Sequence, residues 1–119
     1  MTNQELISRI HAAPLRAVFA VTGGGVSALS RLLAEAGASA TVLDVRIPYS
    51  AAALETFLGG RVEGSASERT ARAMAMAAFM EAKQFDDSVE VAGIACTAAI
   101  ATNRTRRGSD RAHLAIQTA

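Results

Sequence analysis

The residues best suited to chemistry form a glycine-rich turn, Thr22-Gly23-Gly24-Gly25, directly after an apolar run. Three consecutive glycines let the backbone turn tightly and leave room for a ligand to approach the chain. Helical periodicity follows the turn, and the first amides of a helix carry partial positive charge that suits a phosphate or carboxylate. The turn has neither the G-x-G-x-x-G fingerprint nor a P-loop lysine, so a packing turn without a ligand stays the alternative.

The concentrated positive charge of the chain lies at Arg104, Arg106, Arg107 and Arg111, offset by Asp110. Arginine forks bind phosphate, and the segment follows a predicted strand, so we expect it to form the rim of a pocket for a phosphate-bearing ligand. A solvated loop or a contact with another subunit explains the same charges. Nucleic acid is not an expected partner, because no aromatic residues interleave with the arginines.

Other reactive side chains near the turn have ordinary structural explanations. Thr22 has no histidine or lysine beside it in sequence, so we expect it to cap the following helix. Cys96 follows a strand, and an inert buried thiol is the commoner state, although nearby arginines could activate it. His11 and His113 are isolated, so we predict neither a metal nor a cofactor.

Apolar periodicity predicts a chain that alternates helices with strands. The expected elements are a helix capped by Thr2 and ended by Pro14, strands over residues 15–21, 41–47, 89–95 and 112–118, and helices over residues 26–36, 51–58 and 67–84, the last two begun by Ser50 and Ser67. The segment before the last strand lacks a helical period, so the last two strands are predicted to be antiparallel. The pattern therefore favours an α/β sandwich with a mixed sheet.

In two of the predicted strands, apolar and polar residues alternate, and this alternation predicts which side chains share a face. Leu43, Val45 and Ile47 are expected to share one face of an edge strand. In the last strand, His113 and Gln117 should lie opposite Leu114 and Ile116.

Length and composition limit the function classes. With 119 residues, a net charge of +1 and one cysteine, residues 1–119 are expected to form one domain, either alone or as the first module or a fragment of a longer chain. Neither a signal peptide nor a span long enough for a bilayer is present, so we expect a cytoplasmic protein without membrane partners.

Six segments occur in an order that is typical of one family. They are Val21-Thr22-Gly23-Gly24, Gly37-Ala38-Ser39, Pro48-Tyr49-Ser50, Leu58-Gly59, Ser67-Glu68 with Ala71, Met74 and Ala75, and Val91-Ala92-Gly93-Ile94-Ala95. Together they resemble the C-terminal domain of the CinA (competence-damage-inducible) family over about residues 15–117. The resemblance implies a three-layer α/β/α fold with a small mixed, mostly parallel sheet.

The resemblance also implies an ancestral chemistry, the hydrolysis of nicotinamide mononucleotide to nicotinate mononucleotide and ammonia. Active members are similar to Ser/Lys amidases, with a tyrosine that assists proton transfer. The serine position is Ala20 in this chain and the lysine position is Leu54, while Tyr49 stands at the tyrosine position. An enzyme of this kind needs both the nucleophile and the base, and the loss of either one removes most of its rate enhancement.

We therefore expect a catalytically degenerate CinA-like domain that binds a small phosphate-bearing or nucleotide-like ligand. The alternatives are an active amidohydrolase with Thr22 or Cys96 as a substituted nucleophile, and a structural module for a homo-oligomer or a fused nucleotidyltransferase-like domain. No catalytic residue is predicted. The expected ligand-binding residues are Thr22, Gly23, Gly24, Gly25, Tyr49, Gly93, Arg104, Arg106 and Arg107.

Overall fold

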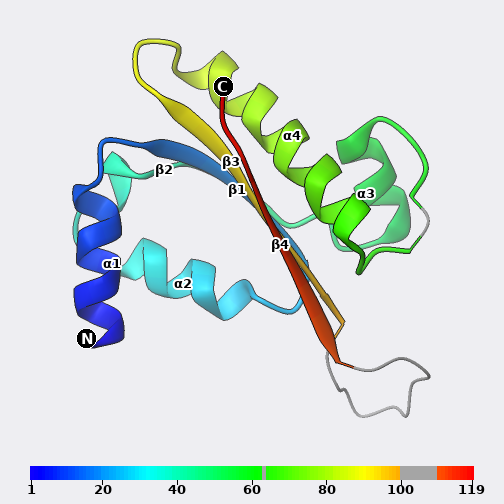
Figure 1. Cartoon of the computed structure of the whole chain (residues 1–119), viewed down its shortest axis with the longest axis horizontal. Helices are drawn as coiled ribbons and strands as arrows, with labels where there is room; N and C mark the ends of the chain where they lie inside the picture. Colours follow the sequence, from blue (N-terminus) through cyan, green and yellow to red (C-terminus); the bar gives the residue numbers. More distant parts are fainter. Residues whose placement is uncertain (63, 100–109) are drawn as a thin grey trace.

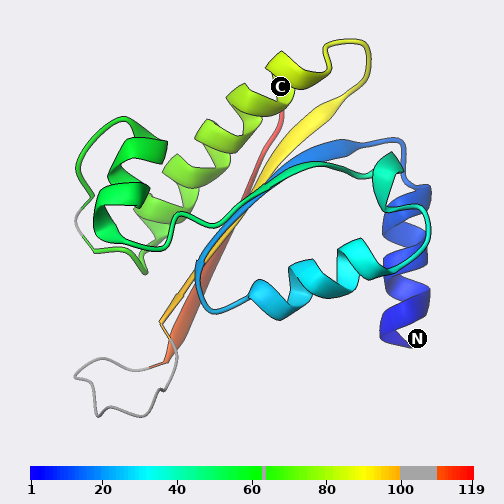
Figure 2. The ribbon, with the colours of Figure 1, turned by 180° about the vertical axis from the view of Figure 1, so that it is seen from behind.

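The computed structural model describes residues 1–62, 64–99 and 110–119, which form a sheet with helices on both faces (Figures 1 and 2). The elements are helices α1 (Asn3–Ala12), α2 (Val26–Ala34), α3 (Ala51–Leu58) and α4 (Glu68–Phe85), the short 3-10 helix η1 (Ala38–Ala40), and strands β1 (Arg16–Gly23), β2 (Val42–Arg46), β3 (Val91–Ala99) and β4 (Arg111–Gln117). None of the described helices is both long enough and apolar enough to cross a membrane.

The described strands form one mixed sheet in the order β2-β1-β3-β4. β1 pairs in parallel with both β2 and β3, and β4 is antiparallel to β3. The parallel pairs are joined through helices, as parallel neighbours require a crossover. The prediction of an α/β sandwich with a mixed, mostly parallel sheet is confirmed, and so is the antiparallel last pair.

Alternate residues of β1 enter two separate apolar cores. On the side covered by α3 and α4, Val18 and Ala20 join what we call the α4-side core; the other buried members are Leu54, Met74, Ala75, Ala78, Phe79, Ala82, Val91 and Ala95. On the opposite side, Phe19 and Val21 join the α2-side core; the other buried members are Ala17, Leu29 and Ala92. β1 is thus buried on both faces, as its continuous apolar run predicts.

Side-chain caps begin three of the helices as the sequence predicts. The hydroxyls of Thr2, Ser50 and Ser67 each accept a hydrogen bond from the amide three residues later, at 3.1, 3.0 and 3.1 Å. Helix α2 is shorter than predicted: it ends at Ala34, and Gly37, with φ +93°, begins η1 instead. The backbone of Glu35 is already extended, with ψ 144°, so the helix ends before it reaches the predicted stop at Gly37.

The predicted shared face of Leu43 and Val45 is wrong. The pairing of β1 with β2 shifts register between Ala17 and Val18, so that Val18 lies opposite Asp44. Such an irregularity inserts one residue and changes which face the following side chains occupy. Leu43 therefore packs on the α4-side core, while Val45 packs on the α2-side core.

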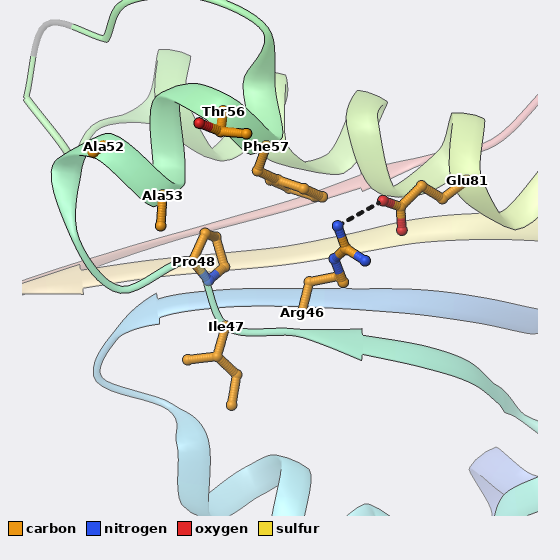
Figure 3. A pocket seen from close by; sticks show the side chains of 8 residues that line it. All are labelled: Arg46, Ile47, Pro48, Ala52, Ala53, Thr56, Phe57 and Glu81. Atoms are coloured by element: carbon orange, nitrogen blue, oxygen red, sulfur yellow. Dashed lines mark ion pairs between the residues drawn. The ribbon is translucent and has the colours of Figure 1, made fainter.

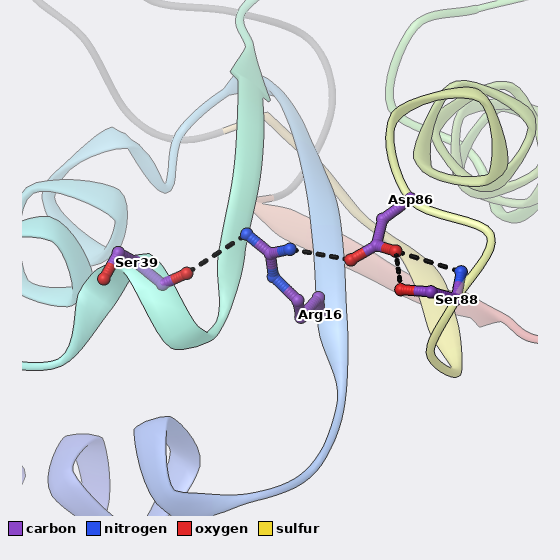
Figure 4. A network of polar contacts seen from close by, with 4 residues as sticks. All are labelled: Arg16, Ser39, Asp86 and Ser88. Carbon is purple, nitrogen blue, oxygen red and sulfur yellow. Dashed lines mark hydrogen bonds and ion pairs between the residues drawn. The ribbon is translucent and has the colours of Figure 1, made fainter.

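A polar network connects the start of β1 to η1 and to the loop after α4 (Figure 4). Arg16 Nη1 lies 2.7 Å from Asp86 Oδ2, and Arg16 Nη2 donates to the Ser39 carbonyl at 3.2 Å. The hydroxyl and amide of Ser88 donate to Asp86 Oδ1 at 2.6 and 3.0 Å. The Ser88 hydrogen bonds, followed by the bond from Arg16, hold the pKa of Asp86 below its ordinary value.

Candidate functional site

The carboxyl ends of β1 and β3 lie side by side and carry two buried threonines. Thr22 is paired with Thr97 in the parallel register. The Thr22 hydroxyl donates to the Pro48 carbonyl at 3.0 Å, and the Thr97 hydroxyl donates to the Ser65 carbonyl. The two hydroxyls therefore anchor the loops that precede α3 and α4 to this end of the sheet.

The expected cap by Thr22 is wrong. Gly25 occupies the N-cap position of α2 and makes no side-chain cap, while Thr22 is turned to Pro48 on the other side of the sheet. Sequence reasoning also missed Thr97, whose only signal was a single hydroxyl within an apolar strand. A buried hydroxyl needs a partner, and the partner here comes from a loop far away in sequence.

The glycines of the turn fit closely against the chain's own backbone. Gly23 has φ +79°, and a Cβ there would lie 1.8 Å from the Ala98 carbonyl oxygen. The Gly24 amide donates to the same oxygen at 3.4 Å. Gly25 has φ +111°, a conformation that L side chains rarely adopt, and a Cβ there would lie 3.3 Å from Val21 Cγ1. The close approach of β3 at Gly23 and the left-handed backbone of both residues account for these glycines without a ligand.

Gly93 lies under helix α4. A Cβ at this position would approach the Ala75 carbonyl oxygen to 2.0 Å and the Phe79 amide nitrogen to 2.3 Å. Both atoms belong to the helix backbone, which cannot move aside as a flexible side chain can. Gly93 is thus the point of close contact between β3 and α4.

The positions that resemble the family's serine and lysine come together in space. Ala20 of β1 and Leu54 of α3 are 0% and 1% exposed and belong to the same α4-side core. Met74 and Phe79 of α4 complete the apolar surroundings. The two positions are therefore surrounded by apolar side chains of β1, α3 and α4.

Tyr49 lies outside that core, on the loop that Thr22 anchors. Its side chain is 81% exposed, and within the described part of the chain its hydroxyl makes no hydrogen bond. The loop residue Pro48 is its neighbour and lines an open groove. Tyr49 itself is exposed and is not one of the residues that line this groove.

The groove has a volume of about 540 Å³ and lies between the end of β2, helix α3 and helix α4 (Figure 3). In Figure 3, Arg46 points toward α4 and Ile47 points to the opposite side of the strand. The lining residues are Arg46, Ile47, Pro48, Ala52, Ala53, Thr56, Phe57 and Glu81.

Arg46 forms ion pairs with two carboxylates at this groove. Arg46 Nη2 lies 3.3 Å from Glu81 Oε1, and Arg46 Nη1 lies 3.8 Å from Asp44 Oδ2. The guanidinium is 5.6 Å from the centre of the Phe57 ring, within the range of a cation–π contact. Glu81 Oε2 is buried, and no hydrogen bond from a described residue reaches it. Sequence alternation placed Arg46 on a strand face but could not predict its distant partner Glu81.

Cys96 lies on the other face of the sheet from Ala20, because it is paired with Val21. It packs against the α2-side core and is half-buried. Burial raises the pKa of the Cys96 thiol above its ordinary value. A raised pKa lowers the thiolate fraction near neutral pH, which is the opposite of activation.

The predicted basic rim is only partly described by the structure. Arg104, Arg106 and Arg107 lie outside the described residues. Arg111 begins β4, and its Nε donates to the Ala66 carbonyl at 3.0 Å. This bond holds the loop before α4 in place next to the anchor made by Thr97.

The histidines do not approach each other. His11 is buried, with Nδ1 2.8 Å from the Thr41 hydroxyl and Nε2 2.8 Å from the Leu32 carbonyl, so it joins α1 to α2 and to the start of β2. His113 lies opposite Thr97 in β4. In residues 1–62, 64–99 and 110–119, no three His, Cys, Asp or Glu side chains are grouped as a metal site requires.

Comparisons with known proteins identify the fold. No protein-family model and no curated protein matches the sequence. Among solved structures, the competence/damage-inducible protein CihA of Agrobacterium tumefaciens superposes with a TM-score of 0.70 at 26% identity, over 97% of this chain and 73% of that one. A CinA-superfamily protein of Escherichia coli gives 0.63 at 19% identity, over 96% of this chain and 73% of that one. The chain is therefore a CinA-like protein.

Proposed function

We propose that this chain is a CinA-like binding domain that has lost amide hydrolysis and holds a small phosphate-bearing or nucleotide-like ligand. The observation that carries the first part is the burial of Ala20 and Leu54 in one apolar core. At the positions that resemble the family's nucleophile and base, this chain has a methyl group and an isobutyl group. Covalent catalysis has no reacting atom there.

Neither substitute nucleophile is well placed. The Thr22 hydroxyl is buried and donates to a backbone carbonyl, so it lacks a base that could take its proton. The Cys96 thiol lies on the α2 side of the sheet, and burial raises its pKa. These contacts support binding over an active amidohydrolase.

The groove beside α3 is the place where we expect the ligand. Arg46 is 46% exposed and can present its remaining N–H groups to a phosphate. The first turn of α3 supplies Ala52 and Ala53 to the same wall, near the positive end of the helix dipole. Glu81 Oε2 is an acceptor in need of a donor, such as a base or carboxamide N–H. A nucleotide offers both kinds of group in one molecule.

The test is a ligand-dependent melting experiment with nicotinamide mononucleotide, nicotinate mononucleotide, AMP and inorganic phosphate. A ligand at about 100 times its dissociation constant stabilises the fold by about 2.7 kcal/mol, which raises Tm by several degrees in a domain of this size. We expect at least one mononucleotide to raise Tm. Arg46→Ala should abolish the rise, and Arg9→Ala on helix α1 should retain it.

Three results would count against the proposal. If no compound in the panel shifts Tm, ligand binding is rejected. If the shift survives Arg46→Ala, the ligand lies elsewhere. If ammonia is released during the incubation, the claim of lost hydrolysis is rejected.

A second candidate function is a structural module, and one observation favours it. Leu114 and Ile116 of β4 are 77% and 67% exposed. The polar side chains His113 and Gln117 of the same strand are turned toward α4 and are half-buried. A strand that exposes its apolar side chains and covers its polar ones is more typical of a subunit or domain contact than of an isolated surface.

A further inference from the structure

Glu81 lines the groove with a carboxylate that is only partly satisfied. Its side chain extends from α4 toward Arg46 in Figure 3, and its Oε1 lies 3.3 Å from Arg46 Nη2. Its Oε2 is buried, and no hydrogen bond from the described residues reaches it. A buried polar atom without a partner is rare in folded proteins and destabilises them, because the atom has lost its water. Here the atom belongs to a residue that lines an open groove.

Arg46 does not satisfy the carboxylate of Glu81 fully. A charge-assisted hydrogen bond between nitrogen and oxygen is about 2.7–2.9 Å long. The separations from the guanidinium to Glu81 and to Asp44 are longer, at 3.3 and 3.8 Å. The same guanidinium also faces both carboxylates, so one positive charge is shared between two negative charges. This end of the groove therefore has acceptor capacity left over.

The chemistry of a carboxylate decides which ligand group fits beside Glu81. An ionised carboxylate only accepts hydrogen bonds, so the ligand must bring an N–H or O–H donor of its own. A ligand oxygen without a hydrogen would leave two acceptors facing each other. Because Oε1 faces Arg46, Oε2 is the oxygen left for the ligand, and one oxygen suits a single amino group. The last side-chain torsion of glutamate is broad, so the carboxylate can turn Oε2 toward the groove.

Phe57 offers a surface for an aromatic ring at the same end of the groove. Its ring lines the groove and lies 5.6 Å from the Arg46 guanidinium. Figure 3 shows Ala52 toward one end of the groove and Phe57 with Glu81 toward the other. Ala52 and Phe57 are about 7.5 Å apart along the axis of α3. A nucleoside monophosphate is long enough to cover this distance, with its base against Phe57 and its phosphate between Arg46 and the first turn of α3.

We infer that Glu81 is the specificity-determining residue of this groove, and that it selects a nucleotide whose base carries an exocyclic amino group, such as adenine. This inference rests on the proposed function, because it concerns the same groove and the same class of ligand. The amino group of the base donates to Glu81 Oε2, while Arg46 holds the phosphate. Binding therefore gives the buried oxygen the partner that it lacks in the free protein.

Calorimetric titration with AMP and with the 5′-monophosphate of purine riboside tests this selection. The two nucleotides differ only in the 6-amino group, so the ratio of their dissociation constants reports the contact with that group. We expect AMP to bind about tenfold more tightly or better, as a hydrogen bond to a charged acceptor provides. Both nucleotides are measured on the same protein, so a general loss of stability cancels in the ratio.

Two variants of Glu81 connect the ratio to its carboxylate. Glu81→Met keeps the length of the side chain without the charged acceptor, so the two nucleotides should bind about equally well. Glu81→Gln keeps an acceptor and loses its charge, so its ratio should fall between those of Glu81→Met and the wild type. Glu68→Met is the matched control on the same helix: Glu68 is 70% exposed, is paired with Arg72 and does not line the groove. Its ratio should equal that of the wild type.

The outcomes separate this inference from the proposed function. If the wild type binds both nucleotides equally well, the selection by Glu81 is wrong and the binding function stands. If another mononucleotide binds and AMP does not, the selection is also wrong. A preference for AMP that survives both Glu81→Met and Glu81→Gln assigns the amino group to a different residue and overturns the inference. If no mononucleotide binds at all, the proposed function and the inference fail together.

Discussion

Ala20 of β1 and Leu54 of α3 lie in one buried core, at the two positions where the resemblance to active CinA proteins places a nucleophile and a base. Both side chains are apolar, and both contribute to the packing of the α4-side core. The consequence can be measured as stability.

Truncating Leu54 should cost more than truncating an exposed leucine. Leu54 is 1% exposed, so Leu54→Ala leaves a cavity and should lower the free energy of unfolding by about 2–5 kcal/mol. Leu6→Ala on α1, where the side chain is 48% exposed, should cost less than about 1 kcal/mol. Urea unfolding of both variants measures the difference, and equal costs would show that Leu54 is not a core residue.

The Thr22 hydroxyl should matter for stability through its bond to Pro48. Thr22→Val keeps the shape but leaves the buried carbonyl without its donor, at a cost of about 1–3 kcal/mol. Thr22→Ser keeps the donor, so its free energy of unfolding should stay close to that of the wild type. Chemical unfolding of the pair separates the hydroxyl from the methyl group, and the account fails if Ser and Val variants are equally destabilised.

Two glycines should respond in opposite ways to a methyl group. Gly93→Ala forces a Cβ into the backbone of α4 and should destabilise the fold by about 1–3 kcal/mol or more. Gly60→Ala meets no atom within 4 Å, and its effect should be neutral or stabilising by up to about 1 kcal/mol. Thermal unfolding compares them. A harmless Gly93→Ala would mean that α4 does not lie on β3 as described.

The Asp86 network predicts a loss of stability in acid. Its hydrogen bonds from Ser88 and the bond from Arg16 lower the pKa of Asp86 in the folded state, so the unfolded chain binds the proton more readily. The stabilisation is complete above the ordinary carboxyl pKa of about 3.9 and is lost as pH falls through the lower folded-state value.

Melting of the wild type and Asp86→Asn between about pH 2.5 and pH 6 checks this window. The advantage of the wild type should shrink as pH falls, whereas Asp87→Asn, at the adjacent exposed position, should show no such trend. A constant gap between wild type and Asp86→Asn across the range would contradict the assignment.

Local signals in the sequence predicted most of the elements. Continuous apolar residues around Val18 predicted a strand buried on both faces, and Ser50 and Ser67 marked helix starts that the structure confirms. These features depend on neighbours in the chain, which a sequence displays directly. The antiparallel last pair followed from the absence of a helical period before β4.

Features that depend on distant residues could not be predicted. The register shift beside Ala17 moved Leu43 to the other face of β2, because pairing between strands decides it. Thr22 bonded to Pro48 rather than capping α2, because a loop from another part of the chain supplies the acceptor. The groove needs Arg46 and Glu81 to meet, and no local pattern joins them.

Ammonia release from nicotinamide mononucleotide tests the central claim most directly. The purified 119-residue chain should release no more ammonia than buffer alone, with an active CinA-family amidohydrolase as the positive control. Rapid release that follows the concentration of this chain would contradict the account, because it would require reacting atoms other than the carbon side chains of Ala20 and Leu54.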